Sequence, residues 1–232
     1  MAGAAGAYAQ GTMTFGDYGN GFTIDVFSQQ LLGPASQTHG NSLFDNPVGP
    51  TVYTGVGLGG SATGTGPTAY GNGALWTIAL YAAPGVNNIY GLAAAEIANT
   101  PIVTSLFQTS GGTGAANTGT FGNDSAGVWA LNLNSNAKTV FPGFTGGATL
   151  QLEACYNGGA ANLTYAASPV EGSSVIGEIA ALGGTGSPPV PTPNLGASGI
   201  TSFIVVGGDE IPEPSTIVLG VVGASAFLFR RR

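Results

Sequence analysis

The sequence predicts a mainly β protein: a single β-sandwich, immunoglobulin-like or jelly-roll-like, with Gly-rich loops and a short C-terminal transmembrane helix. Short apolar runs recur between clusters of turn-forming residues, a pattern typical of sandwiches and barrels. Glycine makes up 41 of 232 residues without a three-residue period, which indicates turns rather than collagen. The chain is 43% hydrophobic, so it is apolar enough to fold around one sizeable core.

Ten segments are predicted as strands, because each is short, apolar or β-branched, and bounded by turn residues. They are residues 11–15, 22–27, 52–58, 75–82, 102–108, 128–133, 139–141, 149–156, 174–181 and 202–206. Residues 149–156 alternate most clearly, which predicts one buried face and one exposed face. The buried face holds Leu150, Leu152, Ala154 and Tyr156, and the opposite face holds Gln151, Glu153 and Cys155.

One helix and three long loops complete the predicted body. Residues 90–99 are rich in alanine, which favours a helix of barely three turns. Residues 59–73, 110–122 and 183–194 are rich in Gly, Ser, Thr, Asn or Pro and are predicted as loops. The domain organisation that we expect is a signal-peptide remnant at 1–9, an ectodomain at 10–206, a stalk at 207–211 and a sorting segment at 212–232.

Charge and cysteine content exclude several classes of protein. The chain has 11 acidic and 4 basic residues, and three of the basic ones are Arg230, Arg231 and Arg232. A body whose only strong cation is Lys138 cannot neutralise a run of phosphates, so we expect no nucleic-acid partner. The single Cys155 fits neither a disulfide framework nor a thiolate metal site, and is predicted to be a buried strand residue.

The sequence marks no catalytic or metal site, and we expect neither an enzyme nor a cofactor. The single histidine, His39, lies in a polar stretch predicted as a solvated loop, and no Gly-x-Ser-x-Gly elbow occurs. A glycosidase needs only two carboxylates, so the inventory leaves that class open. No pair of acids is marked by the sequence, and Glu153, Glu171 and Glu178 are all predicted to be solvated.

Two further groups of residues can each be interpreted either as a binding site or as an ordinary structural feature. Residues 17–21, Asp-Tyr-Gly-Asn-Gly, offer oxygens for calcium, but the spacing is not that of an EF-hand and an Asx turn is favoured. Aromatic side chains form either a sugar-binding platform or, as is usual on alternating strands, part of the core. These aromatics are Trp76, Trp129, Tyr53, Tyr70, Tyr81 and Tyr156.

The N-terminal residues resemble the end of a signal peptide. Ala7-Tyr8-Ala9 fits the small-x-small pattern that signal peptidase reads, so Gln10 is the expected first residue of the mature chain. The basic start and the apolar stretch that precede such a site are absent from these residues. The alternative is a small flexible tail.

The C-terminal residues combine three elements in a fixed order. Pro212 and Pro214 flank Glu213 and hold this segment extended, which suits recognition by a protease. The uncharged run 217–229 spans about 20 Å as a helix, short against a hydrocarbon core of about 30 Å. The terminal arginines favour the cytoplasmic side. The expected anchor residues are Ile217, Val218, Leu219, Val221, Val222, Phe227, Leu228 and Phe229.

Pro-Glu-Pro-Ser-Thr, a short apolar helix and a basic end together resemble the PEP-CTERM sorting domain found on proteins of exopolysaccharide-producing Gram-negative bacteria. The resemblance covers about a tenth of the chain. It implies Sec export, a transient inner-membrane anchor, recognition of Pro212-Glu213-Pro214 by exosortase, and delivery to the cell surface or extracellular matrix. The body also resembles, more weakly, uncharacterised β-rich ectodomains that carry this signal. An ordinary C-terminal membrane anchor is the competing interpretation.

These observations predict a non-enzymatic surface or matrix protein with an adhesive or structural role in the exopolysaccharide layer. Its expected partners are exosortase, signal peptidase, the inner membrane and extracellular polysaccharide. The alternative is a carbohydrate-binding module or a glycan-acting enzyme delivered by the same route. Outward-facing tryptophans or a pair of acids in a cleft would favour that alternative.

Overall fold

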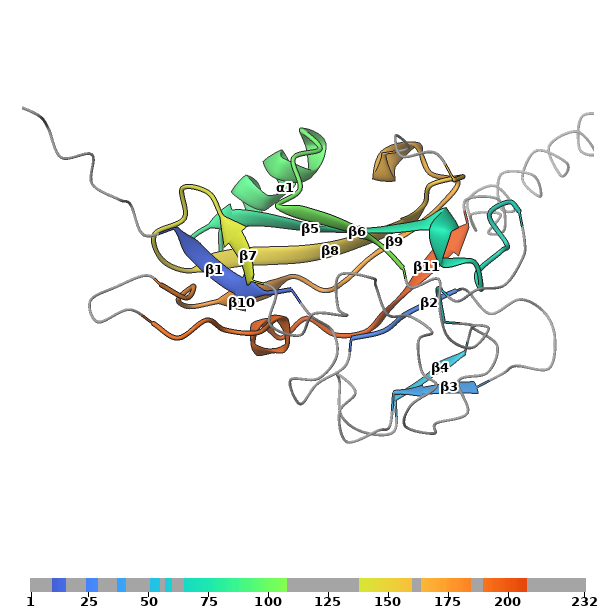
Figure 1. The fold of residues 1–232 in the computed structure, drawn as a ribbon, viewed down its shortest axis with the longest axis horizontal. Coiled ribbons are helices and arrows are strands. Elements are labelled where there is room, and N and C mark those ends of the chain that lie inside the picture. Colours follow the sequence, from blue (N-terminus) through green and yellow to red (C-terminus); the bar gives the residue numbers. More distant parts are fainter. Residues whose placement is uncertain are drawn as a thin grey trace, which may run out of the picture.

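The computed structural model is mainly β, which confirms the predicted class (Figure 1). It describes residues 10–15, 24–28, 37–40, 51–54, 57–59, 65–107, 138–159, 164–184 and 190–207, with the backbone alone for 37–40 and 51–54. The strands are β1 (Gly11–Thr14), β2 (Val26–Ser28), β3 (Gln37–Gly40), β4 (Thr51–Thr54), β5 (Trp76–Pro84), β6 (Val103–Leu106), β7 (Lys138–Phe141), β8 (Ala148–Tyr156), β9 (Val170–Ser173), β10 (Gly177–Ile179) and β11 (Phe203–Gly207). The helices are α1 (Ile89–Ile97) and the 3-10 turns η1 (Gly73–Leu75), η3 (Tyr165–Ala167) and η4 (Leu195–Ser198).

A curled seven-stranded sheet forms the body, in the order β2-β11-β9-β8-β5-β6, with the seventh strand, β10, paired with β8 beside this path. Its central pair is β5 and β8, antiparallel over nine residues from Trp76 opposite Tyr156 to Pro84 opposite Ala148. The other edge of β8 is shared, because β10 pairs with its first residues and β9 with its last. Ser174 joins the two halves: its backbone N–H donates to Leu152, and its hydroxyl accepts from the Leu152 N–H.

The main core lies on one face of this sheet. Alternate residues of β5 and β8 point into it, with Trp76, Ile78 and Leu80 fully buried. The two-stranded ribbon β1-β7 adds Met13 and Phe141 to the same cluster. The ribbon is tied to the segment before β11 by bridges from Thr12 to Gly183 and from Thr14 to Asn194. Leu150, Leu152 and Ala154 of β8 lie in this core, so the alternation of residues 149–156 correctly predicted the buried face of that strand.

The other face of the sheet is covered by α1, which lies across β5 (Figure 1). Ala79, Tyr81 and Ala83 of β5 pack there against Leu92 of the helix in a second, smaller apolar cluster. The helix begins after Asn88, whose side-chain oxygen accepts from the Gly91 N–H. Its end is set by Asn99, which has a left-handed φ of 49°. The predicted helix 90–99 is confirmed, shifted by one or two residues.

The other predicted strands agree with the structure to different degrees. Observed strands overlap most of the predicted ranges 11–15, 75–82, 102–108, 139–141, 149–156 and 202–206. The strand predicted at 22–27 is observed later, as β2, and those at 52–58 and 174–181 are shorter. Two observed strands, β3 and β9, were not predicted, because their polar or Gly-containing residues show no apolar pattern. The strand predicted at 128–133 lies outside the described residues.

Within the described ranges, no helix has both the length and the apolar character that a membrane crossing needs. The predicted transmembrane helix, residues 217–229, lies outside those ranges, as does the predicted stalk beyond Gly207.

Candidate functional site

Most residues predicted to direct export and sorting lie outside the described residues. This holds for Pro212, Glu213 and Pro214, for the anchor and arginine segments that follow them, and for Ala7 and Ala9. Gln10, the expected first residue of the mature chain, is described. It is exposed and comes directly before β1, so the predicted cleavage point adjoins the start of the folded body.

The structure shows a group of acidic residues on the face of the sheet that α1 covers. Glu153 on β8 lies opposite Ala79 on one side and Ser173 on the other. Glu171 on β9 pairs with Cys155, the next residue of β8 on that face. Glu96 approaches from α1. We call Glu96, Glu153 and Glu171 the carboxyl cluster.

The prediction that Glu153 and Glu171 are solvated is wrong. Glu153 is only 7% exposed, and Glu171 is half-buried within a strand rather than beside a turn. The alternation correctly placed Glu153 on the face away from the main core. A single sequence gave no sign that α1 would pack over that face, and this packing is what buries the carboxyl group. The structure also confirms Cys155 as a buried strand residue.

Burial and mutual repulsion make the carboxyl cluster hold protons unusually well. Burial, and then the negative charges of Glu96 and Glu171, raise the pKa of Glu153 to about 7. Burial also raises the pKa of Glu96 and of Glu171. Coupled acids of this kind titrate as a group, so the raised pKa belongs to the cluster as much as to Glu153.

The groups around the carboxyl cluster cannot compensate its charge. Burial, followed by the charge of Glu153, raises the pKa of Tyr81 and of Cys155 to about 12, so both remain neutral at ordinary pH. Tyr165 of η3 also has its pKa raised to about 12, chiefly by burial and Glu171. Within the described ranges, Glu96 Oε1 and Glu171 Oε2 are buried without a hydrogen-bond partner.

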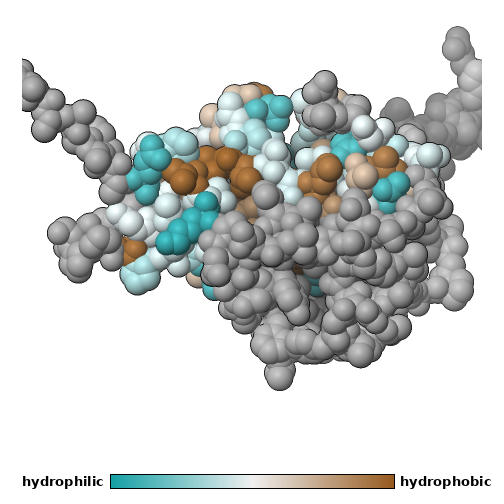
Figure 2. Space-filling view, viewed as in Figure 1, coloured by the Kyte–Doolittle hydropathy of each residue, from teal (hydrophilic) through white to brown (hydrophobic). Residues whose placement is uncertain are grey.

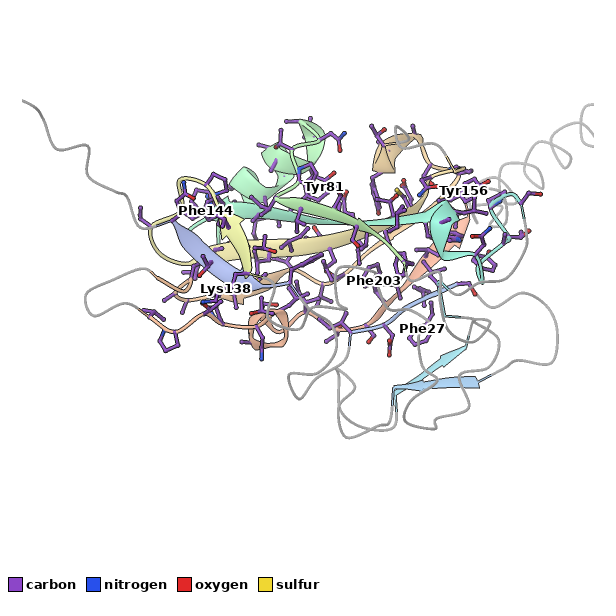
Figure 3. All side chains as sticks on the ribbon, viewed as in Figure 1. Phe27, Tyr81, Lys138, Phe144, Tyr156 and Phe203 are labelled. Carbon is purple, nitrogen blue, oxygen red and sulfur yellow. The ribbon has the colours of Figure 1, made fainter. Side chains whose placement is uncertain are left out.

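Chemically, this arrangement can store a proton near neutral pH. Among the described residues, no three His, Cys, Asp or Glu side chains are arranged to hold a metal ion. The only Lys or Arg side chain in that part of the chain is Lys138 on β7, which is not among the groups that shift the pKa of Glu153 (Figure 3).

The aromatic side chains that the structure describes belong mainly to the interior. Trp76 is fully buried, stacks on Tyr70 at 5.4 Å between ring centroids, and meets Tyr156 edge-on at 5.6 Å. Its indole N–H donates to the carbonyl of Ala69 at 3.2 Å. Tyr81 is buried beneath α1 and donates its hydroxyl to Asn99 Oδ1 at 2.8 Å (Figure 3). Trp129 and the side chain of Tyr53 lie outside the described residues. The other four aromatics, Tyr70, Trp76, Tyr81 and Tyr156, belong to the core as the sequence favoured, although Tyr156 is only half-buried.

Three further sequence predictions have mixed outcomes. His39 lies on β3, opposite Val52 of β4, so the loop predicted around it is wrong. Local polarity concealed a strand that pairing with β4 stabilises. Glu178 is exposed, as expected, but it lies on β10 and accepts from the Asn87 N–H at 2.8 Å. The Asp-Tyr-Gly-Asn-Gly segment, 17–21, lies outside the described residues.

Apolar side chains also reach the outer surface of α1 and its flanking turn (Figure 2). Tyr90 is 93% exposed and Ile97 is 87% exposed, and they are two turns apart on the same side of the helix. The helix therefore turns Leu92 and Glu96 toward the sheet and leaves Tyr90 and Ile97 on the outside.

Comparison with known proteins identifies the C-terminal segment. The family model described as the PEP-CTERM protein-sorting motif matches residues 210–232. No curated protein and no solved structure matches the chain.

Proposed function

The chain is a PEP-CTERM protein, and on this basis we propose that it is a cell-surface or extracellular-matrix protein with a structural or adhesive role in the exopolysaccharide layer. The motif makes it an exported protein that is anchored transiently and then processed by exosortase. Its body, in this proposal, is a single β-sandwich without enzymatic activity.

The observation that carries the proposal is the motif at 210–232. We propose that Pro212-Glu213-Pro214 is the element exosortase recognises, because two prolines keep it extended in front of a helical anchor. Residues 217–229 would hold the chain in the inner membrane, and Arg230, Arg231 and Arg232 would keep its end in the cytoplasm. Signal peptidase would release the other end before Gln10.

The body supports a structural rather than a nucleic-acid-binding or sugar-platform role. With 11 acidic and 4 basic residues, the chain repels polyanions. Trp76 faces the core, and buried aromatics contribute to packing instead of offering a flat surface to a sugar ring.

One observation favours a second candidate, a glycan-acting enzyme exported by the same route. The carboxyl cluster contains an acid with a pKa of about 7 beside another carboxylate, which is the pairing that glycoside hydrolysis requires. Buried acids with shifted pKa values also occur in purely structural positions. A screen of the purified protein on polysaccharides separates the candidates, because turnover abolished by Glu153→Gln or Glu171→Gln would establish the enzyme.

The sorting proposal is tested by changing Pro212, Glu213 and Pro214 together to alanine in the native host. Alanines allow the anchor helix to extend backwards from Ile217, which removes the extended segment. We expect the variant to accumulate in the inner membrane with its uncleaved mass, as seen by fractionation and intact mass spectrometry. Ser215→Ala with Thr216→Ala is the matched control and should be sorted normally. Delivery of the triple variant to the matrix at normal rate and size would refute the proposal.

A further inference from the structure

We propose that α1 is a pH-sensitive latch, closed over β5 and β8 while the carboxyl cluster shares protons and opened when the cluster becomes fully ionised. The latch goes beyond the sorting function, since it concerns the folded body alone. Opening would expose the apolar surface formed by Ala79, Tyr81 and Ala83.

The geometry supplies the first reason. The three acids come from three different elements: Glu96 from α1, Glu153 from β8 and Glu171 from β9. Glu153 is more than nine-tenths buried. Among the described residues, one oxygen of Glu96 and one of Glu171 are buried without a hydrogen-bond partner. A buried carboxyl without a partner is tolerated far better when protonated than when charged.

The second reason is that, among the described residues, no cationic group faces the carboxyl cluster. The titratable groups facing Glu153 are Tyr81 of β5, Cys155 of β8, Glu171 of β9 and Glu96 of α1, and Tyr165 of η3 lies next to Glu171. Each is neutral or negative. Glu178 of β10, near the start of α1, is also acidic. Loss of protons can therefore only add repulsion, and a pKa of about 7 for Glu153 places that loss near neutrality.

The third reason is that α1 is not joined to the sheet by a ladder of backbone hydrogen bonds. The ladder of hydrogen bonds joins β8 to β9 and β5, so repulsion between Glu153 and Glu171 cannot easily separate these strands. The helix rests on the sheet through small side chains and Leu92. In the described part, the side-chain hydrogen bonds between the sheet and α1 with its flanking residues lie at the two ends of the helix. Tyr81 donates to Asn99 at one end; at the other, Asn88 donates to Thr149 and to the Pro84 carbonyl, and the Asn87 N–H donates to Glu178. An element without a ladder to its neighbours can open locally while the sheet stays paired.

Hydrogen exchange on the full chain in a mild non-ionic detergent tests the latch. After correction for intrinsic exchange rates, protection of the amides of residues 92–98 should fall about tenfold or more between about pH 5.5 and about pH 8.5. Amides of Leu150 and Leu152 in β8 should keep their protection. Glu153→Gln mimics the protonated acid, so α1 in this variant should be equally protected at both pH values.

Glu178→Gln is the matched control, since the amide oxygen still accepts from Asn87 and the exposed acid lies outside the carboxyl cluster. Its α1 should lose protection at high pH as the parent does.

Three results would overturn the latch. One is protection of α1 that does not change with pH in the parent. Another is an unchanged pH dependence in Glu153→Gln when circular dichroism shows that the variant is folded. The third is restoration of α1 protection at about pH 8.5 by millimolar calcium, since a metal ion would then be the partner of the acids instead of protons.

Discussion

Glu153 lies on β8 beneath α1, where burial and the charges of Glu96 and Glu171 raise its pKa from 4.5 to about 7. A raised pKa means that, between these two values, the folded protein binds more protons than the unfolded chain. Stability from this residue is therefore complete below about pH 4.5 and is lost as the pH rises through about 7. We therefore expect the contribution of Glu153 to stability to be larger in mild acid than at about pH 8.

Glu153→Gln should raise the free energy of unfolding at about pH 8 by up to about 3 kcal/mol and leave it nearly unchanged at about pH 4. The reason is that glutamine has no charge to lose, and its volume is close to that of the protonated acid. Urea titrations of parent and variant at the two pH values measure the difference. Equal stabilisation at both pH values would contradict the assigned pKa direction.

Trp76 illustrates the opposite case, a residue whose contribution comes from packing. It is fully buried between Tyr70 and Tyr156 at the start of β5. Trp76→Ala should destabilise the body by about 3–5 kcal/mol through lost contacts and a residual cavity. Tyr90→Ala, at a position 93% exposed, is the control and should change stability by less than about 0.5 kcal/mol. Thermal unfolding followed by tyrosine circular dichroism distinguishes these outcomes.

Among the elements, α1 depends on its two ends more than on its length. Nine residues are too few for an isolated helix, so capping and contact with β5 must stabilise it. The side-chain oxygen of Asn88 caps the first turn, and its side-chain NH₂ donates to the Pro84 carbonyl at 2.9 Å. The backbone N–H of Asn88 donates to the Thr149 hydroxyl. Asn99 ends the helix and accepts from Tyr81.

Asn88→Ala should therefore destabilise the protein by about 1–2 kcal/mol and increase exchange in α1 before any other element. The side chain is lost from both of its hydrogen bonds, while the backbone contact to Thr149 remains. Its neighbour Asn87 has a left-handed φ of 56°, so Asn87→Gly is a suitable control that should be neutral or slightly stabilising. If Asn88→Ala had no effect on α1 exchange, the cap would be unimportant.

For the complete chain, the two processing points are attached to opposite ends of the body. β1 begins at one end of the long axis and β11 finishes at the other (Figure 1). Cleavage before Gln10 and cleavage near residue 212 would therefore act on well-separated parts of the surface. Neither event would disturb the sheet, because Gln10 precedes β1 and the sorting motif follows β11.

The mature protein recovered from the native cell surface should begin at Gln10. Ala7 and Ala9 supply the small side chains that signal peptidase requires, and Gln10 is exposed. N-terminal sequencing checks this. Ala9→Phe should block the cleavage, whereas Tyr8→Phe should leave it intact. Recovery of an intact Met1 on surface protein would show that these residues are an ordinary tail.

Reversing Arg230, Arg231 and Arg232 to glutamate should impair topology rather than cleavage-site recognition. Acidic residues do not hold a helix end on the cytoplasmic side, so the C-terminal end of the anchor should no longer be retained in the cytoplasm. A protease-protection assay on inner-membrane vesicles should then find the C-terminus accessible from outside. Wild-type accessibility in this variant would remove the arginines from the anchoring mechanism.

The sequence determined the class of the protein, its sorting signal and the inner face of the central strands. Each depends on local information: the order of Pro-Glu-Pro, apolar helix and arginines, or the two-residue period that separates Leu150, Leu152 and Ala154 from their neighbours. The burial of Glu153, the strand character of His39 and β9, and the grouping of Glu96 with Glu171 were not predictable in this way. They arise when α1 folds back on the sheet and when strands far apart in the chain pair. The environment of a carboxyl group depends on those distant neighbours, and no local pattern in the chain records which neighbours they will be.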